Sequence, residues 1–285
     1  MFSLRIRNEY NREIDLTSSS CYTVEEIDGL SPIDARINEN EVFGMDGTKF
    51  NSAKAEPRVL TIVLAINGPA EDNRLMLYNY LKIKQRHRIF FSNGQKDVYI
   101  DGYLQSMPIS YFDIQEKAVI VFRCPDPYWR DMIDIGLDIG NTIELFEFPF
   151  EIEEPIPFSE IDIYGNKTIF NHGHVASGMI ASIRAELTCS NVKIVNVSTG
   201  EYIGITGNLS PGEELIIDTI DKEKSISIRN ALGVVSNAIG RMMTGSTFLK
   251  ILPGENVIQL LCTNAEGNAQ FLNGVLYINT LYEGV

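Results

Sequence analysis

The sequence of 285 residues has little that would take it into or across a membrane. Its longest apolar run, Val59 to Ile66, has eight residues, whereas a helix that spans a bilayer needs about 20. The N-terminus has no basic segment followed by an apolar core, the pattern of a secretory signal peptide. We therefore expect a protein made in the cytoplasm that has no membrane partner.

Cysteine and histidine are scarce, with four and three copies. The cysteines form no CxxC pair, so neither a zinc knuckle nor a thioredoxin-like redox site is indicated. We expect them to be free thiols; they are Cys21, Cys124, Cys189 and Cys262. His172 and His174 flank a glycine, but no third metal ligand is indicated nearby and such spacing is more typical of a turn. The expectation is no metal and no cofactor.

Positive charge is also in short supply, because 24 Lys and Arg face 38 Asp and Glu for a net charge of −14. A general nucleic-acid binder is thus disfavoured, since Lys and Arg supply most of the affinity for phosphate. One basic cluster could contact phosphate, although we favour the basic end of a helix. It consists of Lys82, Lys84, Arg86, His87 and Arg88.

Catalytic signatures are missing: there is no Walker A loop, GxSxG elbow, HExxH motif or Gly-rich dinucleotide turn. Glycosidases use a pair of carboxylates, but a chain with 38 acidic residues offers many such pairs by chance. Their presence therefore gives little support for a glycosidase. The hypothesis that the protein is a hydrolase therefore has no motif to support it, and we expect that the protein is not an enzyme.

What is present is ordinary globular composition, 44% hydrophobic and 22% charged, in two unlike halves. The stretch Asn141 to Gly165 has seven acidic residues, no Lys or Arg, and prolines at 149, 155 and 157. Proline and like charges both favour an extended connector. We expect an N-terminal domain over residues 1–130, a connector over 131–155 and a C-terminal domain over 156–285.

The first half predicts strands and one helix. Arg58–Ile66 is rich in β-branched residues and ends at Asn-Gly-Pro, and further strands are expected at 88–91, 98–104 and 117–123. Between them, Glu71–Gln85 has apolar pairs at helical spacing, with acidic residues first and basic residues last.

The second half contains no good helix. Short apolar segments recur about every ten residues, and Pro211-Gly212 and Pro253-Gly254 suit turns that need positive φ at the glycine. This pattern predicts an antiparallel sandwich or barrel. The expected strands are 161–164, 180–187, 192–197, 215–218, 225–228, 248–251, 257–261 and 275–278.

One segment reads as a protruding hairpin with large apolar side chains. Asp46-Gly47 is a signal for a two-residue turn, and the apolar residues around it need a surface to cover. That surface lies either on the same domain or on a neighbouring molecule. The candidate interface residues are Phe43, Met45, Asp46 and Phe50.

Taken together and in this order, the motifs resemble the distal tail proteins of siphovirus-type bacteriophages and related tail-like particles. The matching segments cover nearly the whole chain. They are Gly44–Gly47, the strand 58–66, the helix 71–85, Phe122–Tyr128, Asn171–Gly173, Asn196–Glu201, Leu215–Thr219, Ser246–Phe248 and Leu252–Asn256.

The resemblance implies a mainly β chain, with an N-terminal β-rich domain that has one helix and a C-terminal galectin-like antiparallel β-sandwich. It also implies a homo-hexameric ring at the virion's tail tip, alone or as two rings back to back. Its partners would be the tail-tube protein, the tail-associated tip protein and a receptor-binding or side-fibre protein. DNA would only pass through the channel, and an acidic lining would keep it from sticking.

The alternative is a carbohydrate-binding module that uses the C-terminal sandwich to attach to the host cell wall. Sugars in proteins usually stack on an exposed aromatic ring. Trp129, the only tryptophan, is expected to pack at the domain junction instead. The remaining candidates are Tyr164, Tyr202, Tyr277 and Tyr282.

Overall fold

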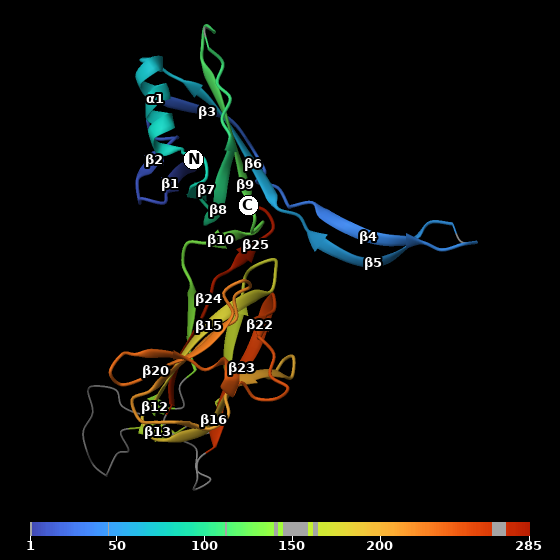
Figure 1. Cartoon of the computed structure of the whole chain (residues 1–285), viewed down its shortest axis with the longest axis vertical. Helices are drawn as coiled ribbons and strands as arrows, with labels where there is room; N and C mark the ends of the chain where they lie inside the picture. The colour runs from blue at the N-terminus through green and yellow to red at the C-terminus, as the bar shows by residue number, and fades with distance from the viewer. Residues whose placement is uncertain are drawn as a thin grey trace. The chain divides into compact units, whose positions relative to one another are not determined.

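The computed structural model describes residues 2–44, 46–111, 113–139, 142–144, 159–161, 165–263 and 272–285. Over these residues the chain is mainly β, all its strand pairs are antiparallel, and it has one α-helix (Figure 1). The expected fold class is thereby confirmed. The chain forms two compact units. Unit 1 is Met1–Met132 with Leu281–Val285, and unit 2 is Ile133–Thr280.

The largest element of unit 1 is a nine-stranded sheet of order β2-β1-β7-β8-β9-β6-β3, with β10 paired to β8 and β25 paired to β10. The predicted strand Arg58–Ile66 is β6 itself. The strands are β1 (Ser3–Asn8), β2 (Glu13–Asp15), β3 (Tyr22–Asp28), β6 (Arg58–Ile66), β7 (Arg86–Ser92), β8 (Asp97–Ser106), β9 (Lys117–Cys124), β10 (Trp129–Asp131) and β25 (Leu281–Tyr282).

Alternation along these strands builds the core of unit 1. In β9 every second residue is buried, as a strand with one covered face requires. Leu60, Ile62 and Leu64 of β6 enter the same cluster from the neighbouring strand. The last residues of the chain also belong here, because Tyr282 of β25 is buried in this core.

The helix α1 (Ala70–Tyr80) is shorter than the sequence predicts. Glu71 and Asp72 lie in its first turn as expected, but its last turn contains no basic residue. The chain leaves the helix at Leu81, which is extended, and Lys84 has a φ of 65° that a right-handed helix does not allow. The expected helix end at Gln85 is therefore wrong, and the lysines follow the helix rather than cap it.

Unit 2 is a β-sandwich, as the strand pattern predicts. One sheet has seven strands in the order β11-β24-β15-β19-β20-β21, with β22 on β15; the other has five in the order β14-β23-β16-β17, with β18 on β16. The first contains β11 (Ile135–Asp138), β15 (Ser177–Ala185), β19 (Glu214–Asp218), β20 (Ser225–Arg229), β21 (Val235–Asn237), β22 (Lys250–Ile251) and β24 (Leu272–Ile278). The second contains β14 (Lys167–Asn171), β16 (Cys189–Asn196), β17 (Glu201–Gly204), β18 (Asn208–Leu209) and β23 (Gly254–Thr263).

One continuous core joins the two sheets of the sandwich: Ile183 and Leu276 come from one sheet and Ile194 and Leu260 from the other. The predicted turns agree, since Gly212 and Gly254 have φ of 81° and 90°. The described residues of unit 2 also include the short pair β12 (Thr142–Glu144) and β13 (Ser159–Ile161), and the 3₁₀ turn η1 (Ile239–Arg241).

Much of the acidic connector expected over residues 131–155 lies outside the described residues. Within it, Ile135–Asp138 forms β11 and pairs with β24 of unit 2. The strand expected at 161–164 also lies largely outside the described residues.

Candidate assembly interface

A two-stranded arm projects from unit 1 between β3 and β6 (Figure 1). Its strands, β4 (Ala35–Glu41) and β5 (Thr48–Ala55), pair only with each other. All described residues from Asp34 to Lys54 are exposed. The arm therefore does not fold back on its own domain, which was one of the two arrangements that the sequence left open.

The turn of the arm differs from the expected two-residue turn. The last strand pair is Glu41 with Thr48, so six residues form the loop. Gly44 and Gly47 have φ of 80° and 82° in this loop, which favours glycine at both positions. The Asp-Gly signal thus identifies the hairpin correctly but not its loop length.

The candidate interface residues of the sequence lie along this arm. Phe43 is fully exposed at the tip and Phe50 is 62% exposed on β5. Asp46 is exposed in the loop, and Met45 lies outside the described residues. Ile37 of β4 is a further exposed apolar residue that sequence reasoning missed, because it has no polar turn beside it.

The root of the arm is held by Arg58, which is only 4% exposed. Its guanidinium donates hydrogen bonds to the carbonyl oxygens of Ser31 at 2.8 Å and Pro127 at 2.7 Å, and also to those of Gly29 and Glu283. Burial lowers the pKa of this arginine. Four backbone acceptors from three chain segments thus replace water around one cation.

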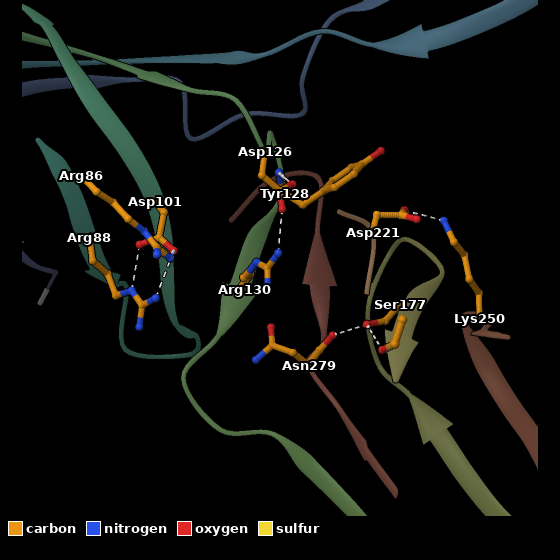
Figure 2. A network of polar contacts seen from close by, with 11 residues as sticks. Arg86, Arg88, Asp101, Asp126, Tyr128, Arg130, Ser177, Asp221, Lys250 and Asn279 are labelled. Carbon is orange, nitrogen blue, oxygen red and sulfur yellow. Dashed lines mark hydrogen bonds and ion pairs between the residues drawn. The ribbon is translucent and has the colours of Figure 1, made fainter. Parts of the chain in front are cut away.

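Arginines of the same unit pair with nearby carboxylates (Figure 2). Arg86 and Arg88 both bind Asp101, and Arg88 lies over the Tyr99 ring at 4.3 Å. Burial raises the pKa of Asp101, but the hydrogen bonds from the two arginines outweigh it, so the pKa is lowered. Arg130 pairs in the same way with Asp126, at 2.7 Å.

These pairs change the interpretation of the basic cluster. Arg86 and Arg88 share the carboxylate of Asp101 as their ion-pair partner, and His87 is fully buried against the Phe122 ring at 5.5 Å. Burial lowers the pKa of His87, so it is neutral at pH 7. His87 is therefore no phosphate ligand, and only Lys82 and Lys84 of the cluster lack an ion pair within the residues that the structure describes.

The remaining polar candidates do not assemble a reactive site. His172 and His174 are exposed beside a turn in which Asn171 accepts a hydrogen bond from the Gly173 N–H. No group of three or more His, Cys, Asp or Glu placed to hold a metal occurs among the described residues. None of the four cysteines forms a disulfide, as expected for thiols. In the described part of the chain, no helix has the length and apolar character to span a bilayer.

The aromatic candidates for a sugar platform differ in exposure. Trp129 is buried in unit 1 against Phe91, and Tyr282 is buried as well. Tyr202 donates a hydrogen bond to the Thr244 carbonyl oxygen at 2.7 Å, and Tyr164 lies outside the described residues. Tyr277 is 44% exposed on β24 and is the candidate that remains.

The polar contacts of unit 2 that Figure 2 shows are structural links between strands and loops. The Ser177 hydroxyl donates to the Asn279 carbonyl oxygen at 2.6 Å, and Lys250 pairs with Asp221 at 2.7 Å.

Comparison with known proteins identifies a family model and solved structures that are similar to this chain. Residues 172–272 match the family model for the C-terminal domain of the siphovirus-type tail component. The whole chain is similar to the solved SPP1 Dit (gp 19.1) protein, with a TM-score of 0.69 and 13% identity over 99% of each chain. The resemblance to siphovirus distal tail proteins is thereby confirmed.

The distal tail fold extends to a second phage. A chain of the phage P2 baseplate in its activated conformation with Ca is similar over 100% of both chains, with a TM-score of 0.54 and 12% identity. The same baseplate with Sr gives a TM-score of 0.53. No curated protein matches the sequence. At this identity the solved structures show a shared fold, and the match to the family model lies within unit 2.

Proposed function

We propose that this chain is a structural subunit of a phage or tail-like particle, in which copies close into a hexameric ring at the tail tip. The observation that carries the proposal is the fold it shares with SPP1 Dit over 99% of both chains. That protein is described as a paradigm of the hub adsorption apparatus in phages that infect Gram-positive bacteria. The contribution of this chain is geometric, and it performs no chemistry.

The exposed arm supports self-association. Phe43, Phe50 and Ile37 present apolar surface to water on an element whose strands pair only with each other among the described residues. A surface of this kind usually marks an interface. If the arm binds a surface of a second copy other than that copy's arm, the contact is head-to-tail, and head-to-tail contacts that close form rings.

The ring would connect the tail-tube protein on one side with the tail-associated tip protein on the other, at the tip of the virion's tail. A receptor-binding or side-fibre protein would dock on unit 2, and genomic DNA would only pass through the channel. The net charge of −14 supports an acidic channel, which repels phosphate. A ring whose pore is lined mainly by Lys and Arg would contradict this part of the proposal.

Carbohydrate binding by unit 2 is the second candidate, and one observation favours it. The Tyr277 ring lies against Gly136, so close that a Cβ on the glycine would be 3.2 Å from it. On the same face of the sheet lies a hollow of about 300 Å³. Its polar lining includes Asp138, Ser182, Arg184, Glu214 and Asn273.

Two experiments separate the candidates. Light scattering of the full chain should give six times the subunit mass of 32.0 kDa, or twelve times for two rings. The double variant Phe43→Ser, Phe50→Ser should stay folded and run smaller. On a glycan array with host wall sugars, we expect no binding by the wild-type protein. Binding by the wild type that is lost in the Tyr277→Ala variant would favour the carbohydrate function instead.

A further inference from the structure

Unit 1 has a hollow beside the C-terminal end of α1. It has a volume of about 510 Å³ and lies between the helix end, the segment that follows it and the end of β8. Its walls are mainly apolar, with Tyr78, Leu81, Ile83, Leu104 and Met107, and Lys82 and Gln85 complete the lining. Ile83 is 64% exposed at this place, so most of its surface faces solvent.

The surroundings of the hollow are also apolar. Leu75, Met76 and Tyr78 of helix α1 are exposed to solvent. The Tyr78 hydroxyl is hydrogen-bonded to that of Tyr111 at 2.8 Å. A solvent-facing helix side normally carries polar residues. Exposed apolar residues gathered around a concave site mark a surface for a partner rather than a solvated face.

Positive charge at the hollow defines what else that partner must offer. Lys82 lines the hollow and Lys84 follows Ile83 in the same segment. Both lysines are exposed, and neither has an ion pair in the described part of the chain. An occupant therefore needs a large apolar side chain and negative charge on its flanks.

The tip of the arm offers both features together. Phe43 is fully exposed there, Glu41 and Asp46 flank it, and residues 41–48 contain no Lys or Arg. The aromatic side chain and the negative charge of the tip thus complement the apolar walls and the lysines of the hollow.

The arm cannot enter the hollow of its own chain. It is a paired ladder about 20 Å long, its root is held by Arg58, and it points away from α1 (Figure 1). An arm tip that occupies this hollow therefore comes from another copy.

We propose that Phe43 of one copy inserts into the hollow beside α1 of the next copy, with Glu41 and Asp46 facing Lys82 and Lys84. The inference rests on the proposed ring and names its contact. The same two surfaces then remain free at the two ends of any open chain of copies, which is the condition for closure into a ring.

A complementation experiment tests this contact. Phe43→Asp destroys the tip and Ile83→Asp destroys the hollow, and both residues are exposed, so each variant should fold as the wild type does. Each alone should associate at least about 30-fold more weakly, because a central aromatic anchor carries much of an interface's affinity. Mixed in equal amounts, they should form a complex of two and no larger species, because only one intact tip can meet one intact hollow.

The control is Leu232→Asp, which places the same charge at an exposed leucine of unit 2 and should assemble like the wild type. As a second measurement, Lys82→Glu with Lys84→Glu should weaken association, and Glu41→Lys with Asp46→Lys on the same chain should restore it. Sedimentation should be run at concentrations where the wild type is fully assembled.

The outcomes separate this contact from the ring itself. If Phe43→Asp or Ile83→Asp assembles like the wild type, or the mixture forms no complex of two, the contact is wrong and the ring proposal stands. If the wild type stays monomeric at every concentration, both are wrong.

Discussion

The guanidinium of Arg58 lies 5.8 Å from the centre of the Trp129 ring, and both side chains are buried. Arg58 is the first residue of β6 and Trp129 the first of β10. The carbonyl oxygens that Arg58 binds come from the start of the arm, from the segment before β10 and from the last residues of the chain. One side chain thus ties the root of the arm to the core of unit 1.

Replacing Arg58 should therefore destabilise unit 1 strongly. Arg58→Met removes the guanidinium that donates to four backbone carbonyl oxygens, and we expect the free energy of unfolding to fall by about 3 kcal/mol or more. Trp129 is the only tryptophan and is buried in unit 1, so its fluorescence during urea unfolding reports on this unit alone. Arg36→Met, on the exposed arm, is the control and should leave the midpoint unchanged. An unchanged midpoint for Arg58→Met would show that the carbonyl groups are hydrated.

Unit 1 should also lose stability at high pH. Burial raises the pKa of Cys124 from 9 to about 12, and that of Tyr22 and Tyr282 from 10 to about 12. Folding then favours the neutral forms, so this stability is complete below pH 9 and declines as pH rises toward 12. The urea midpoint from Trp129 fluorescence should fall steadily between pH 9 and 11.5.

The variant Cys124→Ala isolates part of this effect. It should be less stable than the wild type at pH 8, because it loses buried volume, but its midpoint should depend less on pH. Equal pH dependence in both proteins would mean that the Cys124 thiol is not protected by burial.

Close packing in unit 2 gives a matched pair of glycine variants. A Cβ on Gly178 would lie 2.6 Å from the Cα of Ile220 and 2.8 Å from the Thr219 oxygen, both backbone atoms. Gly178→Ala should cost about 1–3 kcal/mol. Gly240→Ala meets nothing within 4 Å and should be neutral.

Hydrogen exchange of the amides in β15 and β19 measures this difference. We expect faster exchange in Gly178→Ala and unchanged exchange in Gly240→Ala. Similar exchange in both variants would show that β15 and the chain after β19 can move apart without loss of stability.

The sequence predicts the strands of this fold well, but it predicts poorly the features that depend on contacts between distant segments. Arg58–Ile66 was identifiable because a segment rich in β-branched residues runs up to a turn signal. The helix end was not, because Lys82 and Lys84 continue a favourable charge pattern past Leu81, where the backbone has already become extended. The charge pattern describes the segment's preference, whereas the tertiary structure determines where it ends.

Of the two surfaces in the candidate interface, the sequence predicts the arm but not the hollow beside α1. The arm carries a local signal, an Asp-Gly turn among apolar residues, which sequence patterns detect. The hollow beside α1 has no such signal, because Ile83 and Leu104 meet only through the pairing of distant segments. The burial of Arg58 is equally invisible, since a charged residue at a strand start is usually exposed and its acceptors come from residues 29–31, 127 and 283.

Electron micrographs of the purified full-length chain test the central claim most directly. The account predicts closed rings with six-fold symmetry whose unit 1 copies surround a central channel, and dispersed single particles for Phe43→Asp at the same concentration. Wild-type images that show only single subunits, or open filaments that never close, would contradict it.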